Sequence, residues 1–339
     1  MAKLKVLVLM HTDLIPPVEF TEKEYMSADW KTEYDVMETL KKLGHTVEPL
    51  GLIGNLELLR NALEEFKPQI VFNLLEEFDG EPTFDQHIVS YLELKKQAYT
   101  GCNPRGLTLA RDKALSKKIL AYHRIPVPKF FVFPKNQKIK DSKKIIYPLI
   151  VKSTTAESST GIAQASVVNN FEALKERVEF IHGNVETDAI TEQYIKGREL
   201  YVGIMGNKRV TTLPVWELEF SKLPKGTKKF ATEKVKWDDD YREKYGIQSV
   251  RAANLSDEEI NQLMSLSKKV YKALGLSGYA RLDFRFHENG KPYFLEANPN
   301  PGIQCGDEFP EAAEAYGLEY KDLLSKLLTL GISWNKNRR

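Results

Sequence analysis

A β-hairpin signal near the C-terminus constrains the fold of this 339-residue chain more than any other feature. Two runs that alternate between polar and apolar residues, 279–286 and 292–298, flank the dipeptide Asn289-Gly290. Both central residues of a type I′ turn have positive φ, and Asn-Gly is the dipeptide that tolerates this best. The sequence therefore predicts an antiparallel hairpin closed by a two-residue loop at Asn289-Gly290.

This predicted register brings acidic side chains together on one face of the hairpin. Asp283 falls directly across from Glu296, and Arg281 falls across from Asn298. The apolar pairs on the opposite face are Phe284 with Leu295 and Phe286 with Tyr293. Directly opposed like charges destabilise a sheet, so the two carboxylates need a counter-charge, which Arg281 can supply in part.

A divalent cation is a second way to satisfy this acidic pair. Oxygen atoms from Asp, Glu and Asn side chains suit Mg²⁺, which usually takes one or two carboxylates together with substrate phosphates. The alternative is a surface hairpin with an ordinary Arg–Asp–Glu cluster. The rest of the chain has to decide whether a nucleotide is present.

Composition excludes several classes of protein. The 49 basic and 47 acidic residues give a net charge of +2, too small to indicate a nucleic-acid partner or binding to a membrane surface. There is no apolar run of 18 residues and no charged-then-apolar leader, and two cysteines do not make a disulfide scaffold. We expect a cytoplasmic α/β protein of two or three domains.

Residues 1–100 alternate between strand and helix patterns. Strands are predicted near 4–9, 45–50 and 69–73, with helices near 36–43 and 56–66 between them. This βαβαβ order favours a doubly wound parallel sheet that binds ligands at the carboxyl ends of its strands. One of those ends leads into the acidic loop 76–81, for which a solvated charged turn is the simpler interpretation.

The middle of the chain carries a candidate phosphate loop. A single helix is predicted over 107–124, with Leu115 inward and with Lys113 and Lys117 as solvent lysines near its outer face. A strand over 147–152 then ends in Lys152 and leads into a small, hydroxyl-rich loop. Such a loop can bind phosphates through backbone N–H groups, although linkers of this composition are common and no Walker A motif is present.

Three further segments complete the pattern. A strand, a glycine turn and another strand are predicted over 192–202, and the polar, lysine-rich segment 222–237 is typical of a lid or a disordered loop. A capping box at 256–259 begins a long helix. A last amphipathic helix near 320–330 is expected to cover the sheet.

In this order, the parts resemble the ATP-grasp superfamily, and specifically its D-alanine–D-alanine ligase branch, over nearly the whole chain. The matching stretches are DKALSK (112–117), VKSTTAESSTGI (151–162), EQYIKGRE (192–199), EKVKW (233–237), and ARLDFRF with FLEANPNPG (280–302). The resemblance implies an α/β fold with an N-terminal doubly wound parallel sheet (1–104). A central ATP-grasp subdomain (105–193) and a C-terminal ATP-grasp subdomain with a Mg-binding hairpin (194–339) follow, both with antiparallel sheets.

The resemblance also implies roles for matching residues in binding Mg·ATP. The phosphate contacts fall to Lys117 and Lys152, to the loop residues Ser158, Ser159 and Gly161, and to Lys236 in the lid. The adenosine contacts fall to Glu192, Gln193, Tyr194 and Ile195 at the base and to Glu199 at the ribose. Two Mg²⁺ ions, or Mn²⁺ in their place, would be held by Asp283, Glu296 and Asn298, while Arg281 and the N–H of Gly302 would stabilise the transition state.

The reaction implied is amide formation from a small carboxylate and an amine through an acyl phosphate, in an enzyme type that commonly forms homodimers. The sequence departs from the family at the substrate end. Glu76 replaces a histidine, no equivalent of a glutamate after the first strand is present, and Asp307 replaces a serine that helps to bind the acceptor's carboxylate. Because an aspartate repels a carboxylate, we expect an amino-acid or amine acceptor other than D-alanine, with Glu76 and Asp307 as candidate substrate contacts.

Three alternatives stay open at this point. The chain could be a genuine D-alanine–D-alanine ligase, or it could bind ATP without catalysis. A structural or nucleic-acid-binding protein that uses the lysines of segment 222–236 is the third alternative, which the near-zero net charge disfavours.

Overall fold

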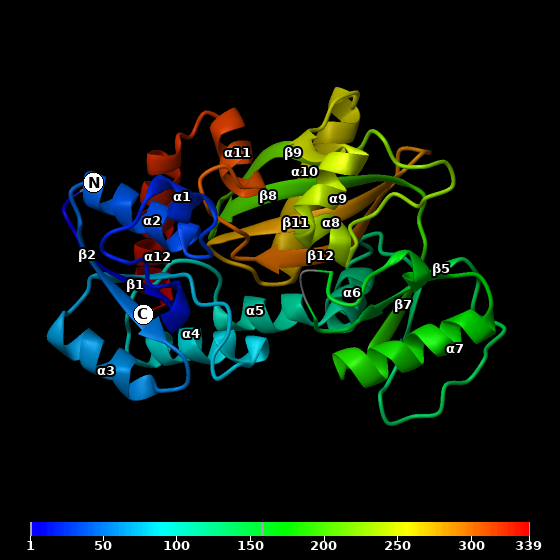
Figure 1. Cartoon of the computed structure of the whole chain (residues 1–339), viewed down its shortest axis with the longest axis horizontal. Coiled ribbons are helices and arrows are strands. Elements are labelled where there is room, and N and C mark those ends of the chain that lie inside the picture. The colour runs from blue at the N-terminus through cyan, green and yellow to red at the C-terminus, as the bar shows by residue number, and fades with distance from the viewer. Residues whose placement is uncertain (1, 157–158, 339) are drawn as a thin grey trace.

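The computed structural model describes residues 2–156 and 159–338, in which one parallel and two antiparallel sheets form (Figure 1). The strand orders are β2-β1-β3 in the parallel sheet, β4-β7-β5-β6 in the central sheet and β10-β9-β8-β11-β12 in the C-terminal sheet. The predicted α/β class, with an N-terminal parallel sheet followed by antiparallel sheets, is confirmed. Residues 157 and 158 lie outside the described part, and Ser158 of the predicted phosphate loop is one of them.

The parallel sheet has helices on both faces, as a doubly wound fold requires. Its strands are β1 (Lys5–His11), β2 (Thr46–Leu52) and β3 (Ile70–Asn73), and nearby helices are α1 (Glu22–Met26), α2 (Lys31–Lys42), α3 (Leu56–Glu65) and α4 (Asp85–Leu94). Val6 and Val8 of β1 pack in a core with α2, whereas Leu7 and Leu9 pack in a core with α3 and α4. Successive strand residues point to opposite faces, so an unbroken apolar run covers both.

The helix predicted over 107–124 is two helices, α5 (Pro104–Arg111) and α6 (Lys113–Tyr122). Asp112 has extended backbone angles and its carboxylate accepts hydrogen bonds from two N–H groups of the first turn of α6. This N-cap restarts the helix and changes which face is buried. Leu115 is therefore exposed, and Lys113 and Lys117 are buried rather than solvent-facing, so our prediction was wrong for all three.

The central sheet contains β4 (Phe130–Phe133), β5 (Leu149–Ser153), β6 (Val167–Val168) and β7 (Ala189–Gln193), with α7 (Phe171–Phe180) packed against β5 and β6. The C-terminal sheet contains β8 (Gly197–Gly206), β9 (Val210–Phe220), β10 (Ile247–Arg251), β11 (Tyr279–His287) and β12 (Pro292–Pro299). Between them run α8 (Glu233–Trp237), α9 (Asp239–Tyr245) and α10 (Asp257–Ala273), the last beginning at the predicted Ser256 capping box.

Two helices cover the two faces of the C-terminal sheet differently. Leu200 and Val202 of β8 pack in the same core as α10, whereas Tyr201, between them, packs in the same core as α11 (Glu308–Ala315). Asp283 pairs with Tyr201 and therefore lies on the α11 face. The acidic face of the hairpin is thus the face that α11 covers only in part, which leaves room for ligands beside it.

The hairpin of β11 and β12 reaches its predicted polar pairing by a different route. Asp283 is opposite Glu296 and Arg281 is opposite Asn298, as predicted. The loop is not the predicted two-residue turn, because the N–H of His287 donates to the carbonyl of Lys291 and only Gly290 of the loop residues has positive φ, +79°.

A β-bulge beside the acidic pair compensates for the longer loop. Phe284 pairs with Phe294, and Phe286 pairs with Pro292, which corrects the predicted partners of both. Leu295 is the extra residue between Phe294 and Glu296, and it shifts the register back by one position. A three-residue turn and one bulge therefore give the same polar pairing as a two-residue turn without a bulge.

The last helix returns to the N-terminal sheet. α12 (Tyr320–Arg338) packs against α2 and β3, and Figure 1 shows its red ribbon among the blue N-terminal elements. Its buried face carries Leu323, Leu324 and Leu327.

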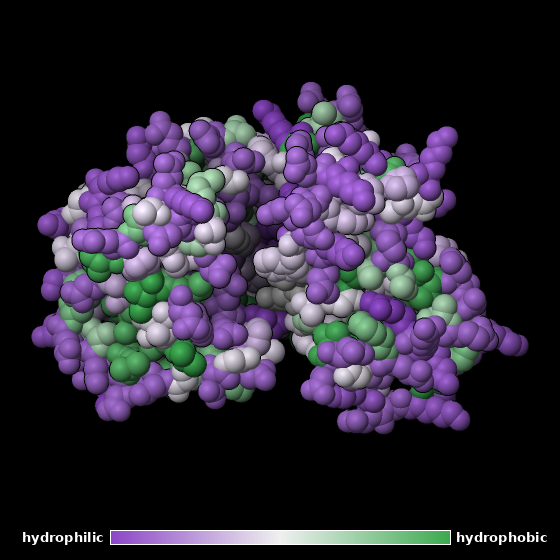
Figure 2. Space-filling model, in the orientation of Figure 1, coloured by the Kyte–Doolittle hydropathy of each residue, from purple (hydrophilic) through white to green (hydrophobic). Residues whose placement is uncertain are grey.

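In Figure 2 the surface is hollowed between the N-terminal lobe and the rest of the molecule, and hydrophilic residues dominate this view. Within 2–156 and 159–338, every helix is too short or too polar to cross a lipid bilayer.

Candidate active site

A cavity between the central and C-terminal sheets gathers the charged residues of the sequence motifs; we call it the nucleotide cavity. The space inside it is about 50 Å³. The residues that line it come from α6, β5, the loop after β5, β8, β11, β12 and the segment before and within α8. They are Lys113, Ile150, Lys152, Ser153, Ala156, Ser159, Thr160, Ile162, Glu199, Tyr201, Phe230, Ala231, Lys236, Asp283, Arg285, Leu295 and Glu296.

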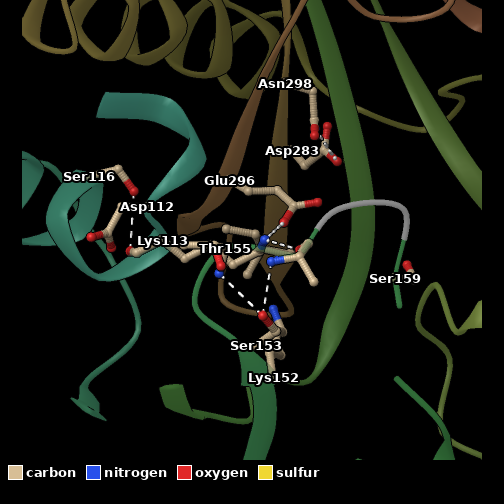
Figure 3. Close-up of polar contacts among 12 residues, drawn as sticks. Asp112, Lys113, Ser116, Lys152, Ser153, Thr155, Ser159, Asp283, Glu296 and Asn298 are labelled. Carbon is tan, nitrogen blue, oxygen red and sulfur yellow. Dashed lines mark hydrogen bonds and ion pairs between the residues drawn. The ribbon is translucent and has the colours of Figure 1, made fainter. Parts of the chain in front are cut away.

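The acidic pair of the hairpin forms one wall of the nucleotide cavity. Arg281 donates to both oxygens of Asp283, from Nε at 2.8 Å and from Nη2 at 2.9 Å. Asn298 donates to Asp283 from Nδ2 at 3.1 Å, which leaves its amide oxygen available as a ligand. Figure 3 shows Asn298 and Asp283 side by side and Glu296 pointing toward Lys113. The counter-charge that we expected from Arg281 is present.

The two buried carboxylates differ in proton affinity because their charged neighbours differ. Burial and the neighbouring Glu296 raise the pKa of Asp283 to about 6, although Arg281 acts in the opposite direction. The pKa of Glu296 falls to about 2, because Lys113, Lys152 and Lys236 outweigh the effect of its burial. At neutral pH both carboxylates are therefore ionised and face a ring of cations, which is an arrangement suited to a metal ion and phosphates.

The predicted metal ligands contain only two carboxylates. Among the described residues no group of three His, Cys, Asp or Glu side chains gathers as a metal site would. Asp283, Glu296 and the oxygen of Asn298 form a smaller set, which fits Mg²⁺ because this ion usually completes its shell with water and phosphate oxygens. The metal-binding role of these residues stays a prediction that the residue types support.

A buried chain of three charges lies behind the nucleotide cavity. Glu192 is fully buried, and its carboxylate is 2.9 Å from Nζ of Lys117 and 3.3 Å from Nζ of Lys152. Burial acts to raise the pKa of Glu192, but the two lysines outweigh it and lower this pKa. For Lys117 burial prevails and lowers the pKa, whereas for Lys152 the attraction of Glu192 overcomes burial and raises it. Glu192 therefore positions two lysines.

The structure places Lys113 at the cavity wall and Lys117 behind it. Lys117 donates to the carbonyl of Leu295, the bulge residue, and does not contribute to the lining. Lys113 donates to the carbonyl of Ala156 at 2.7 Å and lies 3.6 Å from Glu296. Our sequence reasoning missed Lys113 because the N-cap at Asp112 was not recognised; an aspartate directly before a run of helix-forming residues was the available signal.

The segment expected to bind adenosine is already well connected within the protein. The N–H groups of Gln193 and Tyr194 donate to the carbonyls of Lys129 and Pro148, at 2.8 and 3.0 Å. These two N–H groups are thus paired within the protein, and the Ile195 side chain is buried. The adenine-binding role of this segment stays a prediction.

Glu199, predicted at the ribose, lies on the cavity wall with a partner that we did not anticipate. Arg285 donates to Glu199 at 2.8 Å, and to the carbonyls of Gly197 and Lys229. The N–H of Ala231 donates to the same carboxylate at 3.3 Å. Arg285 therefore joins the start of β8 to the segment after β9. Its position on the same face of β11 as Asp283 was the signal that could have revealed this role.

The phosphate loop and the lid segment touch each other across the nucleotide cavity. The N–H of Gly161 donates to Glu233 of α8 at 3.0 Å, and the N–H of Glu233 donates to the carbonyl of Ile162 at 3.0 Å. Ser159 has positive φ, +59°, and its hydroxyl lies 3.4 Å from the carbonyl of Ala231. The described form is therefore closed, and its space is below the roughly 300–1,000 Å³ of ligand pockets, so a nucleotide needs the two segments to separate.

A second cavity, of about 600 Å³, lies beyond the hairpin; it shares Lys236 with the nucleotide cavity and is also lined by Arg281. We call it the acceptor cavity. Its lining residues are Lys236, Trp237, Arg242, Gln248, Ser249, Arg281, Pro301, Gly302, Gly306, Asp307, Glu308, Phe309 and Glu311. The structure thus brings together Gly302, Asp307, Arg281 and Lys236, as the predicted roles require, while the exposed Glu76 does not line this cavity.

Asp307 lies directly against Gly302. A Cβ atom at Gly302 would be 2.7 Å from Oδ2 of Asp307, and this oxygen accepts a hydrogen bond from the N–H of Gln304 at 2.9 Å. Burial raises the pKa of Asp307. The turn that carries Gly302 and Asp307 is therefore compact and depends on a glycine at 302.

Comparison with known proteins agrees with this site. Residues 119–329 match the family model described as the D-ala D-ala ligase C-terminus. A D-alanine–D-alanine ligase of Aquifex aeolicus is 31% identical over 88% of this chain and 94% of its own length. An uncharacterised protein, y4sG, of Sinorhizobium fredii is 29% identical over 86% of this chain and 85% of its own.

The fold agrees with solved structures as well. A D-alanine–D-alanine ligase from Bacillus anthracis, solved in complex with ATP, has a TM-score of 0.76 at 22% identity and covers 99% of this chain and 100% of that one. This likeness supports the fold alone. Together with the family match and the gathered motif residues, it leads to one conclusion: the chain belongs to the D-alanine–D-alanine ligase family and is an ATP-grasp ligase, an enzyme type that uses ATP and Mg²⁺.

Proposed function

We propose that this ligase forms an amide between a small carboxylate and an amine acceptor other than D-alanine, through an acyl phosphate. The observation that carries the proposal about the acceptor is the place of Asp307. Its carboxylate lines the acceptor cavity and lies against Gly302, beside the predicted transition-state contacts. A carboxylate on the acceptor would meet a negative charge there, so the cavity favours an amine or a cationic partner.

In the first step, a carboxylate oxygen of the donor attacks the γ-phosphorus of ATP and ADP leaves. Lys113, Lys152 and Lys236 line the nucleotide cavity and neutralise charge on the transferred group. Glu192 keeps Lys152 in place through its buried ion pair. Mg²⁺, when held by Asp283, Glu296 and Asn298, supplies further neutralisation of the phosphates.

In the second step, the amine attacks the acyl carbon, and phosphate leaves with the electrons of the C–O bond and takes up the proton that the nitrogen loses. The tetrahedral intermediate carries a negative oxygen, which needs donors that are already in place. The N–H of Gly302 and the guanidinium of Arg281 lie at the acceptor cavity and are suited to this role. Once the nucleotide has entered, the phosphate loop and the lid, which meet at Gly161 and Glu233 in the closed form, would close over it again and keep water from the acyl phosphate.

A phosphate-release screen tests this function. Pairs of small acids and amines are supplied with Mg·ATP, and D-alanine alone is included. We expect release with at least one acid and amine pair and little with D-alanine alone, and Glu296→Gln should abolish the signal. Turnover of D-alanine alone at rates typical of a ligase would contradict the proposal and identify a D-alanine–D-alanine ligase. Tight Mg·ATP binding without release across the panel would favour a non-catalytic protein.

A further inference from the structure

Arg281 stands between the two cavities, and each of its three guanidinium nitrogens donates to a carboxylate, while Nη1 and Nη2 each carry a second N–H that can meet a small oxyanion. Nε and Nη2 donate to Asp283, and Nη1 donates to Oε2 of Glu308 at 2.8 Å. The guanidinium also stacks over the ring of Tyr201, 4.7 Å from its centroid. The edge of Arg281 that points toward the acceptor cavity is therefore already paired with a carboxylate of the protein itself.

Glu308 is held in this position from its other side. It is the first residue of α11, and its Oε1 accepts a hydrogen bond from the hydroxyl of Ser249 on β10. The pair is sheltered, because the side chains of Arg281 and Glu308 are 18% and 27% exposed. Partly sheltered ion pairs are screened less by solvent and salt than exposed ones. An incoming carboxylate would have to displace Glu308 to reach Arg281.

The neighbouring charges make such a displacement unfavourable. Asp307, adjacent to Glu308, presents its carboxylate against Gly302 on the same wall. The other cations of the acceptor cavity are Lys236 and Arg242, on the α8–α9 side. Arg242 donates to the carbonyl of Val235, and Lys236 also lines the nucleotide cavity. A carboxylate next to the reacting amine would enter between two negative groups, whereas a more distant anionic group could still meet Arg242.

We infer that Glu308 is a specificity-determining residue, which occupies Arg281 and restricts the acceptor to amines whose amine-bearing carbon has no free carboxylate. Simple amines, diamines and amino-acid amides belong to this class. This inference rests on the proposed ligase function and names its acceptor class. In a purely structural alternative, Asp307 and Glu308 stabilise the first turn of α11 through the helix dipole, and this alternative predicts altered stability without altered acceptor preference.

Matched acceptor pairs that differ only in the carboxylate test the inference. Alanine is compared with alaninamide, and ornithine with putrescine, using both enantiomers of the chiral compounds. Acceptor-dependent phosphate release with Mg·ATP gives the ratio of kcat/KM within each pair. We expect wild-type protein to prefer the carboxylate-free member by about tenfold or more, the effect of one charge-assisted contact withheld from the substrate.

Three variants separate specificity from folding. Glu308→Gln removes the charge, keeps the size, and should reduce the preference to within about threefold because Arg281 becomes able to pair with the acceptor. Ser249→Ala loosens Glu308 and should lie between that variant and wild type. Glu314→Gln removes a charge from the exposed side of the same helix and should keep the wild-type preference. Thermal melts report the stability of each.

A binding readout keeps the test independent of the donor acid. Trp237 lines the acceptor cavity and is 70% exposed, so its fluorescence, measured against a Trp237→Phe baseline, follows acceptor binding with Mg·ADP present. Equal or tighter binding of the carboxylated member to wild-type protein would overturn the inference, as would equal changes in Glu308→Gln and Glu314→Gln. If the ligase function itself fails, label will not exchange between ADP and ATP when a donor acid is added. This exchange assay needs no acceptor, so it distinguishes the two failures.

Discussion

The nucleotide cavity and the acceptor cavity share Lys236 but differ in almost every other respect. The first has about 50 Å³ of space and paired charges around it, while the second has about 600 Å³ and is lined largely by one loop and the start of α11. The residues of the first occur at motif spacings on strands. Those of the second are fixed by contacts between distant segments, such as that of Ser249 with Glu308. Chemistry common to a family is therefore readable in motifs, whereas substrate choice depends on tertiary contacts.

Of the two cavities, the nucleotide cavity should show the largest loss of activity on substitution, at Glu296. We expect Glu296→Gln to lower phosphate release by about 10³-fold, because it removes one of the two carboxylates that we predict to hold Mg²⁺. Steady-state kinetics at saturating Mg·ATP measures the effect, and a circular dichroism melt checks the fold. A rate within tenfold of wild type would contradict the metal-binding role of Glu296.

Removing the buried charge behind the same cavity should have the largest effect on stability. Glu192→Gln leaves Lys117 and Lys152 without their shared carboxylate, so we expect about 3–5 kcal/mol less free energy of unfolding. Urea denaturation measures it. As a matched control, Glu217→Gln breaks the more exposed pair with Arg198 and should cost about 1 kcal/mol. Equal losses of unfolding free energy in the two variants would show that burial of the ion pair does not determine how much its removal costs.

Two of the lysines of α6, Lys113 and Lys117, should behave differently, which tests where the wall of the nucleotide cavity lies. Lys113→Met is expected to lower kcat/KM for ATP by about 100-fold, because Lys113 lines the cavity opposite Glu296. Lys117→Met should act mainly on stability, since Lys117 lies behind the wall. Paired kinetics and denaturation of both variants measure this split. Phosphate binding through Lys117 would instead give the larger kinetic effect at that position.

Asp283 should make Mg²⁺ binding at the nucleotide cavity depend on pH. We predict no metal site at the acceptor cavity. Burial raises the pKa of Asp283 to about 6, so below pH 6 a proton competes with the metal and its affinity should fall by about tenfold per pH unit. Mg²⁺ titrations of the rate between pH 5 and 8 measure this dependence. Asp283→Asn should flatten it, and an unchanged midpoint in that variant would assign the titration to another group.

The same raised pKa sets the direction of the stability change in the metal-free protein. The neutral carboxyl is the form that the fold favours, so its contribution is complete below the ordinary pKa of 3.8 and is lost as the pH rises through about 6. Denaturation of wild type and Asp283→Asn without metal, across this range, measures the effect. Stability that increases with pH through this window in wild type alone would contradict the assignment.

The smallest expected effect lies in the acceptor cavity. Asp307→Ser removes one negative charge, and we expect it to improve kcat/KM for acceptors with a carboxylate, D-alanine included, by about three- to tenfold. Kinetics with a carboxylate-free amine serves as the control and should change less. A general loss with every acceptor would point instead to a structural role in the turn at Gln304.

Much of the fold and part of the site were predictable from the sequence for definite physical reasons. The apolar run at 4–9, the Ser256 capping box and the acidic pairing across the hairpin depend on local periodicity and turn chemistry, and the structure contains all three. The hairpin loop was predicted wrongly, and the pairing was right only because the bulge at Leu295 offset the error. Local patterns determine elements well but do not reveal compensating irregularities.

What could not be predicted depends on contacts made across the chain. Lys113 became a cavity residue through the N-cap at Asp112, and Arg285 acquired its role by joining Glu199 to a segment about thirty residues away. Glu308 drew no attention because its partners, Ser249 and Arg281, are 59 and 27 positions distant. Charged side chains of this kind resemble ordinary surface residues until the packing is known.

The bulge at Leu295 gives that position an unusual kind of importance. Deleting the residue would leave Asp283 facing Glu296, since the strand on either side would simply close up, but Lys117 would lose its carbonyl partner. What this position contributes to the hairpin is a main-chain carbonyl, in addition to its place in the lining of the nucleotide cavity. A deletion at this point would therefore detach Lys117 of α6 from the hairpin while keeping the acidic residues paired.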